Sequence, residues 1–439
     1  MIRFFSLLSL ALLLAACGDS SEPTAPAEST PAAQQAAPSP GAGATAYTNA
    51  NVWNGTGAGP MRNANMVVRN GRIESVSAGT APEGAEIVDM GGAWIVPGFI
   101  NAHAHVSGRW AADEVEGIAA RAEGDLALYA RYGVTTLLSL GGAPRESFTL
   151  RDAQNSASLY RARLLLAGEL VFSQDPAEAA AIASSNVDDG VDWIKLRQDD
   201  NLGTSEKMNW DAIEAVMRVA KASDTPVATH IFYMDDAARL LDMGTSLIAH
   251  SVRDQPVTDE FVQTMVDSGV CYVPTLVREV STFVYSERPE FFDDPFFIEA
   301  AKQSEIDRVS DPEFMGRMAT SPSAAGYRIA LEQAQENLHV LQGAGIPIAF
   351  GTDSGPAGRF PGYFEHMEFD LMADAGLTAR DILLSATSVA ANCLNLDDVG
   401  TLEPGKWADF VVIEQNPLSD VTALHSIKSV YVAGNQVAR

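Results

Sequence analysis

Short apolar runs alternate with amphipathic segments along the middle of the chain, and this alternation restricts the possible folds more than any other feature. The amphipathic segments include 113–132, 207–222 and 257–268. The apolar runs are 94–100, 134–140, 163–167, 191–196, 226–230, 247–250, 270–275 and 346–352. Strands that alternate with helices predict parallel pairing. Eight such runs favour a (β/α)8 TIM barrel in the α/β class, and a doubly wound α/β sheet is the alternative.

Further short strands are expected at both ends of the chain, at 65–68, 72–76, 86–89, 408–413 and 429–432. Asn70-Gly71 separates the first two and is the sequence signal of a type I′ hairpin. Strands at both termini that flank a long middle predict one small β-sandwich domain, built from residues 47–92 and 399–439. The barrel is then expected over residues 93–398.

The stretch 276–323 does not follow the alternation. It is rich in aromatic residues, which are Phe283, Tyr285, Phe291, Phe292, Phe296 and Phe297. Two placements stay open, because such a segment can form a cap over the barrel mouth or helices that pack on the barrel wall.

The start of the chain resembles a bacterial lipoprotein signal peptide. A positive start, Met1-Ile2-Arg3, precedes an apolar run over 4–16, which is shorter than the ~20 residues that span a bilayer. The run ends in Leu-Ala-Ala-Cys-Gly, which is similar to a lipobox and implies a signal peptide over 1–16 and acylation of Cys17. Gly18 after the cysteine favours sorting to the outer membrane.

Residues 17–46 are expected to form a flexible tether. From Gly18 to Ala46 the segment has no aromatic residue and no Val, Ile, Leu or Met, so it cannot bury enough apolar surface to offset its ordering entropy. We therefore expect a lipid-anchored protein of the bacterial cell envelope, periplasmic or associated with the outer membrane.

The chain is strongly acidic, with 29 Lys and Arg against 57 Asp and Glu and a formal net charge of −28. This charge argues against binding to nucleic acid or to an anionic membrane through a basic patch. The expected partner is a small-molecule substrate, with the membrane reached only through the lipid anchor. Besides Cys17, the chain has only Cys271 and Cys393, which are expected to be inert core residues because three cysteines are too few for a disulfide framework.

His103-Ala104-His105 closely follows the first apolar run of the middle region. Residues two apart in a strand point to the same side, so both imidazoles can bind one metal ion. The motif alone is weak evidence, but active sites of (β/α)8 barrels gather at the carboxyl ends of the strands.

More candidate ligands lie at the ends of later runs, and they are Lys195, His230, His250 and Asp353. Taken singly, each has an ordinary structural explanation, such as a capping aspartate or a core histidine. An ammonium or a carboxylate beside an apolar strand is nevertheless costly without a partner. Six candidate ligands at the same end of the expected strands therefore predict a metal centre.

Three motifs together resemble the amidohydrolase superfamily, in its imidazolonepropionase-like and Xaa-Pro dipeptidase branch. The motifs are Pro-Gly-Phe-Ile-Asn-Ala-His-Ala-His over 97–105, Gly-Thr-Asp over 351–353, and Gly-Thr-Leu-Glu-Pro-Gly-Lys-Trp-Ala-Asp over 400–409. The resemblance implies a first metal on His103, His105 and Asp353, and a second metal on His230 and His250. It also implies that Lys195 is carboxylated and bridges the two metals.

Elementary chemistry agrees with this assignment. Two divalent ions ~3.5–4 Å apart repel each other and need an anionic bridge, which a carbamate formed from Lys195 and CO2 supplies. A metal-bridging hydroxide is the expected nucleophile, and Asp353 is expected to take its proton and pass it to the leaving amine. Zinc suits the mixed ligands best.

Substrate contacts are expected from residues that follow the ligands in the chain. Tyr233 lies three residues after His230, and in related dipeptidases a tyrosine in this loop meets the substrate carboxylate. Arg253 and Arg197 also follow ligands and can bind a carboxylate, although surface salt bridges are the simpler interpretation. Three other histidines are expected outside the centre: His339 exposed on a helix, His366 beside the ligands at most, and His425 in the sandwich.

Three functions remain open. The first is hydrolysis of a C–N amide or peptide bond in a dipeptide or an N-acyl amino acid. The second is a mononuclear deaminase or a cyclic imide or imidazolone hydrolase, which would not need Lys195. The third is a non-catalytic binding lipoprotein, against which the full ligand set argues.

Overall fold

The computed structural model describes residues 43–438. The expected signal peptide, the lipidation site Cys17 and most of the expected tether lie outside the described residues and stay predictions. The first strand begins at Ala44, so residues 44–46 of the expected tether belong to the folded domain instead. Ala44 and Ala46 form a small buried cluster with Val67. Within 43–438, no helix is long and apolar enough to cross a membrane.

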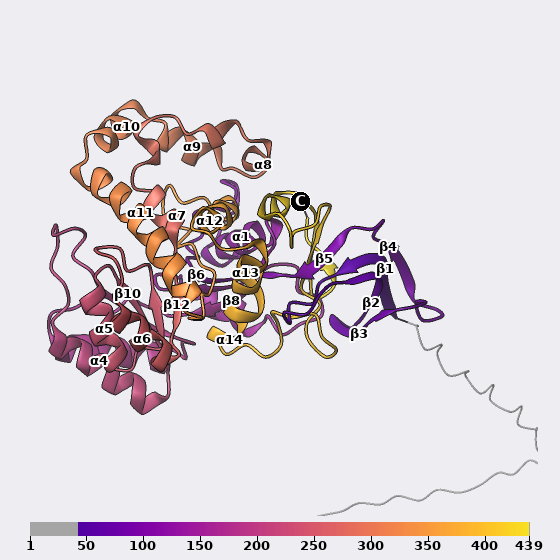
Figure 1. The fold of residues 1–439 in the computed structure, drawn as a ribbon, viewed down its shortest axis with the longest axis horizontal. Helices are drawn as coiled ribbons and strands as arrows, with labels where there is room; N and C mark the ends of the chain where they lie inside the picture. Colours follow the sequence, from indigo (N-terminus) through magenta and orange to yellow (C-terminus); the bar gives the residue numbers. More distant parts are fainter. Residues whose placement is uncertain (1–42, 439) are drawn as a thin grey trace, which may run out of the picture. The chain divides into compact units, whose positions relative to one another are not determined.

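Both ends of the described chain contribute to one sheet, visible around β1 in Figure 1. Its strands are β1 (Ala44–Val52), β2 (Met61–Arg69), β3 (Arg72–Ala78), β4 (Glu86–Asp89), β5 (Trp94–Pro97), β13 (Phe410–Ile413), β14 (Ile427–Val432) and β15 (Asn435–Gln436). Their order is β15-β14-β13-β5-β1-β2-β3, and β4 pairs with β1. The expected hairpin is confirmed, since β2 pairs with β3 and Asn70 and Gly71 have φ angles of 51° and 77°. A two-layered sandwich stays a prediction.

The apolar run 94–100 is divided between two sheets, although it was expected to form one barrel strand. Strand β5 belongs to the terminal sheet, and β6 (Phe99–Ala104) begins after Gly98. A β-carbon on Gly98 would lie 2.0 Å from Oγ1 of Thr135, so the backbone passes this point only because glycine has no side chain.

Parallel strands follow in two sheets. The first has the order β6-β7-β8, with β7 (Val134–Ser139) and β8 (Arg163–Leu166). The second has the order β12-β11-β10-β9, and its strands are β9 (Ile194–Gln198), β10 (Val227–Ile231), β11 (Leu247–Ala249) and β12 (Cys271–Val273). These strands lie in the predicted apolar runs, and most of their residues are buried, as expected for parallel sheets covered by helices.

Isolated parallel bridges join these segments, and they are Val171–Leu196, Tyr272–Ile348 and Ala104–Ser354. The first joins the segment after β8 to β9. The other two place the eighth apolar run, which is not itself a strand, between β12 and β6. The fold is therefore mixed α/β with parallel strands, and closure into a complete barrel stays a prediction.

Helices follow most of the parallel strands. They are α1 (Ile118–Arg131), α2 (Glu146–Asp152), α3 (Pro176–Asp188), α4 (Trp210–Ser223), α5 (Met234–Asp242), α6 (Asp259–Ser268), α11 (Pro322–Gly343), α12 (Tyr363–Asp374), α13 (Ala379–Leu384), the π turn η3 (Ser385–Val389) and α14 (Ala390–Cys393). Helix α4 illustrates why these segments are helical. Asn209 caps its first turn, and Ile213, Val216 and Ala220 recur at helical spacing on its buried face.

The aromatic insertion forms short helices between β12 and α11 (Figure 1). They are α7 (Leu276–Val280), η1 (Val284–Ser286), η2 (Glu290–Asp293), α8 (Pro295–Ile298), α9 (Gln303–Val309) and α10 (Pro312–Ala319). Phe292 and Phe297 share a cluster with Trp110 after β6 and with Phe364 of α12. The hydroxyl of Tyr285 donates to the carbonyl of Gly358 at 2.5 Å. The insertion thus packs on the loops that follow β6 and the eighth apolar run.

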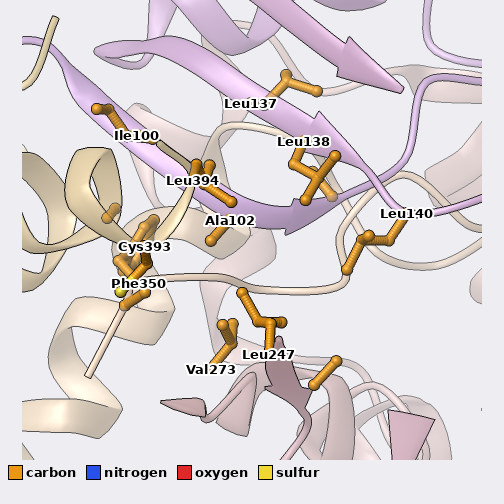
Figure 2. Packing of buried hydrophobic residues seen from close by; sticks show 14 of the residues in the cluster. Ile100, Ala102, Leu137, Leu138, Leu140, Leu247, Val273, Phe350, Cys393 and Leu394 are labelled. Carbon is orange, nitrogen blue, oxygen red and sulfur yellow. The ribbon is translucent and has the colours of Figure 1, made fainter. Parts of the chain in front are cut away.

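The main core gathers apolar side chains from the parallel strands and the last helices. Figure 2 shows Ile100 of β6, Val273 of β12, Phe350 and Leu394 within this cluster. A buried ion pair adds to it, since Nε and Nη2 of Arg163 on β8 donate to both oxygens of Asp409 at 2.6 and 3.2 Å. Asp409 immediately precedes β13, so this two-pronged contact fixes the C-terminal strands against β8. His425 lies in the 3-10 turn η4 (Val421–His425) rather than in a strand.

Cys271 and Cys393 form a disulfide that joins β12 to α14. The prediction of two inert, separate core cysteines was therefore wrong. Their apolar surroundings were read correctly, because Cys393 is buried in the main core. The pairing is long-range, with a sequence separation of 122, and only the packing of the last helix on the strand brings the sulfurs together.

Replacing both Cys271 and Cys393 by serine is expected to lower the free energy of unfolding by about 2–5 kcal/mol, because the disulfide closes a long loop of the unfolded chain. Urea denaturation of the oxidised protein, the reduced protein and the double variant measures the effect. Equal unfolding midpoints for the three samples would contradict a stabilising disulfide.

Candidate metal centre

The predicted ligands converge on one buried place. They are His103 on β6, His105 directly after it, Lys195 on β9, His230 on β10, His250 directly after β11, and Asp353 after the eighth apolar run. The ligand atoms of His103, His250 and Asp353 lie within 4.8 Å of one another. The ring centroids of His230 and His250 are 4.0 Å apart, and those of His103 and His105 are 5.7 Å apart. Lys195 is the second residue of β9, so this strand continues past it instead of ending there as expected.

Three of the histidines are held from outside the centre through one ring nitrogen. The contacts are His105 Nδ1 to the carbonyl of Gly141 (2.9 Å), His230 Nε2 to Oδ2 of Asp199 (2.9 Å) and His250 Nδ1 to Oγ1 of Thr275 (2.7 Å). The Gly141 carbonyl and the Asp199 carboxylate only accept, so they fix the tautomers of His105 and His230, and the Thr275 hydroxyl orients the ring of His250. In each ring the other nitrogen is left to bind a metal. This arrangement is the one that metal-binding histidines need.

Asp353 faces the histidines with one oxygen and a cation with the other. Its Oδ1 lies 2.7 Å from Nε2 of His105 and 3.5 Å from Nε2 of His103. Its Oδ2 pairs with Arg359, whose Nε donates to Oγ of Ser281 at 3.0 Å. Burial alone would raise the pKa of Asp353, but Arg359 and the two histidines outweigh burial and hold that pKa well below its usual range. The carboxylate is therefore ionised, as a metal ligand must be.

Unusual backbone conformations coincide with the centre. His250, Thr275 and Asp353 have φ angles of 74°, 49° and 57°. Positive φ costs a residue other than glycine of order 1–3 kcal/mol and persists only where the surrounding structure enforces it. The chain thus tolerates strain at two candidate ligands and at the threonine that orients one of them.

Lys195 is buried, and its Nζ has no hydrogen-bond partner within residues 43–438. Burial lowers its pKa to about 7, against the opposing effect of the nearby Asp353 carboxylate. A large fraction of this amine is therefore neutral at physiological pH, which is the form that reacts with CO2.

The buried nitrogens fit a metal site. Nε2 of His250 and Nδ1 of His103 join the Lys195 amine as buried atoms that find no partner in the described part of the chain. Burial lowers the pKa of His230 to about 3 and those of His103 and His250 well below the usual range. These imidazoles are therefore neutral, which is the form that binds metals. Unpaired buried polar atoms cost about 1–3 kcal/mol each. Divalent metal ions would satisfy Nε2 of His250 and a carboxylated Lys195, and His103 would bind through Nε2, which faces Asp353.

The three side chains expected to contact the substrate, Tyr233, Arg197 and Arg253, have different partners and different degrees of burial. The Tyr233 hydroxyl donates to Oδ1 of Asp200 at 2.7 Å. Arg197 is partly buried, with its guanidinium 5.6 Å from the ring centroid of Phe172. The interpretation of Arg253 as part of a surface salt bridge was wrong. Its side chain is fully buried, and its Nε lies 3.1 Å from Oε1 of Glu279. Two carbonyls also accept from Arg253, so its guanidinium serves the fold.

Sequence reasoning missed several residues at the centre, among them Arg359 beside Asp353. Asp199 and Thr275 each contact a histidine as described, and Asp199 lies on the same strand side as Lys195 by alternation. Arg278 of α7 is buried, and Nη1 donates to Oε2 of Glu279 at 2.9 Å. Burial lowers the pKa of His230, and the charge of Arg278 lowers it further. Burial alone would lower the pKa of Arg278, but the carboxylates of Glu279 and Asp353 raise it. No short motif marks Arg278, because its position depends on the aromatic insertion.

Residues 94–437 match the sequence model of the amidohydrolase family. An uncharacterised protein of Mycobacterium tuberculosis is 26% identical over 353 residues, which cover 76% of this chain and 82% of that protein. The imidazolonepropionase of Streptomyces avermitilis is 22% identical over 376 residues, 81% of this chain and 82% of the relative.

Solved structures show the same fold. A candidate prolidase from Bifidobacterium longum superposes with a TM-score of 0.73 at 24% identity, over 91% of this chain and 96% of that chain. A Xaa-Pro dipeptidase with bound methionine in its active site superposes with a TM-score of 0.70 at 23% identity, over 90% and 99% of the two chains.

Replacing Asp199 by asparagine is expected to weaken metal binding at His230 about 10- to 100-fold, because the ring loses the carboxylate that orients it. Chelator competition with Zn2+ measures this affinity. The matched control is Asp200→Asn, since this neighbour contacts Tyr233 and not a histidine. Equal zinc affinities in the two variants would show that Asp199 does not support the centre.

Proposed function

The chain belongs to the amidohydrolase family, and from that premise we propose that it hydrolyses a C–N amide or peptide bond in a dipeptide or an N-acyl amino acid, with two divalent metal ions. One observation carries the proposal: the unpartnered amine of Lys195 is buried among the histidines and Asp353. A mononuclear centre has no use for a buried lysine at this place. A carbamate on this lysine supplies two oxygens between two cations.

His103, His105 and Asp353 would hold one ion, and His230 and His250 the other, with the carboxylated Lys195 between them. Zinc suits these nitrogen and oxygen donors best. When bound, such ions polarise a carbonyl group and increase the acidity of a coordinated water.

We assign the proton transfer to Asp353. Its carboxylate is ionised and turned toward the histidines, and Arg359 fixes the second oxygen. It can accept the proton of the attacking water and deliver that proton to the leaving amine. Ser281 holds Arg359 in turn, which restricts the carboxylate to one orientation.

We assign the recognition of a substrate carboxylate to Arg278. The guanidinium is buried close to the centre, and its Nε has no hydrogen-bond partner among residues 43–438. Arg253 also pairs with Glu279 and also has a buried N–H group without a partner among residues 43–438, but two carbonyls accept from it and hold it in the fold. Arg197 and Tyr233 remain secondary candidates. An anionic group next to the scissile bond is what a buried guanidinium binds best.

A second candidate function is hydrolysis of a cyclic imide or imidazolone, or deamination, at a single metal ion. The similarity to an imidazolonepropionase favours it. The buried position of Lys195 distinguishes the two functions, because only a centre with two metal ions needs a lysine there.

The surrounding fold and cellular location follow as proposals. The parallel bridges that flank the eighth apolar run support a closed (β/α)8 barrel, and the shared terminal sheet supports a β-sandwich domain. We also propose a lipid-anchored protein of the cell envelope, acylated at Cys17. The disulfide supports this location, because disulfides persist in oxidising compartments such as the periplasm.

Replacing Lys195 by alanine is expected to remove activity and one of two metal ions, because the anionic bridge is lost. Mass spectrometry of protein grown with zinc and bicarbonate measures the metal content, and a panel of dipeptides and N-acyl amino acids measures activity. Lys221→Ala on the exposed side of α4 is the control. A native protein with one zinc, or full activity in the Lys195 variant, would instead favour the mononuclear function, which ammonia release tests.

Replacing Arg278 by glutamine is expected to reduce kcat/KM about 10- to 100-fold, equivalent to the ~1.5–3 kcal/mol of a charged hydrogen bond. The loss should affect substrates with a free carboxylate and spare the same substrates with an amidated end. Steady-state kinetics on matched pairs measures the difference, and thermal unfolding checks the fold. An equal loss on both members of each pair would remove Arg278 as the carboxylate contact.

A further inference from the structure

Helix α12 carries two buried glutamates that take no part in the chemistry proposed above. Glu365 and Glu368 are separated by one helical turn, and both side chains are fully buried. Burying a carboxylate is costly unless hydrogen bonds satisfy it, so the partners of these two residues indicate their purpose.

Glu365 is hydrogen-bonded to the residues on either side of Asp353 and to Asn101, two residues before His103. Its Oε1 accepts from Nδ2 of Asn101 at 2.7 Å, from Oγ1 of Thr352 at 2.8 Å and from Oγ of Ser354 at 2.5 Å. Thr352 and Ser354 flank Asp353 in the chain. Asn101 in turn accepts from the amide of His103 at 2.9 Å. One carboxylate oxygen thus ties strand β6 to the segment that carries Asp353.

Glu368 contacts the segment that supports His250. Its two oxygens accept from the amides of Leu276 at 2.8 Å and Val277 at 2.7 Å, at the start of α7. The preceding residue is Thr275, whose hydroxyl contacts Nδ1 of His250. Glu368 therefore fixes the backbone that places this hydroxyl against the histidine.

We propose that Glu365 and Glu368 are positioning residues, through which α12 holds the ligands of the first metal and the outer partner of His250 at a set separation. The helix keeps the two glutamates at a fixed distance from each other. Their buried hydrogen-bond networks then permit only one arrangement of the residues that they contact. The inference rests on the proposed function, since it concerns the metal ions of that centre.

The test uses isosteric and truncated variants of each residue: Glu365→Gln, Glu365→Ala, Glu368→Gln and Glu368→Ala. We expect the Glu365 variants to bind Zn2+ about 10- to 100-fold more weakly at the position of His103, His105 and Asp353. The Glu368 variants should weaken the position of His230 and His250 by a similar factor. Chelator competition gives the affinities, and anomalous X-ray scattering from zinc-loaded crystals assigns them to positions.

Met372→Ala is the matched control, because Met372 is buried on the same helix and belongs to the apolar core. It should lower the melting temperature through a cavity and leave both zinc affinities unchanged. Glutamate variants that lower the melting temperature and leave both affinities unchanged, as this control should, would overturn the proposal.

The glutamine variants keep the shape of the side chain, so they decide the question if an alanine variant does not fold. A native protein with a single zinc ion would refute the two-metal function. In that case the Glu365 variants would still test the positioning role, because His103 and Asp353, which Glu365 supports, would bind the single ion.

Discussion

Removing a lysine amine and several imidazoles from water at one place is the constraint on which the rest of this structure depends. Lys195, His103 and His250 each present a buried nitrogen that finds no partner within residues 43–438. Such unpaired groups cost free energy, so the surrounding fold has to supply enough packing to offset them. The parallel strands do so, since their buried apolar residues form one continuous core around the centre.

The ligands are oriented by partners from distant parts of the chain. Thr275 orients His250 and is fixed through the start of α7, while Asp199 orients His230 from the neighbouring strand. Asp199 restricts the His230 ring to one tautomer, and Thr275 fixes the orientation of the His250 ring. The left-handed backbone at His250 and Asp353 persists where the surrounding structure enforces it. The geometry of the metal centre therefore depends on the residues that orient the ligands as much as on the ligands themselves.

Much of the fold was predictable because strand and helix periodicities are local. Apolar runs located the parallel strands, and Asn70-Gly71 located a hairpin. The break at Gly98 was not predictable, because it depends on the distance to Thr135, and neither was the disulfide. The ligand candidates could be read from their places at strand ends, whereas Arg278 required the path of the aromatic insertion.

The terminal sheet also bears on the order in which the chain can fold. Strand β5 lies between β1 and β13, and Asp409 just before β13 completes the ion pair with Arg163 of β8. Until β13 has been made, β5 lacks one of its two strand neighbours and Arg163 lacks its counter-ion. The packing of the terminal sheet on β8 therefore waits for a residue 246 positions beyond Arg163. Pairings over such long sequence separations slow folding.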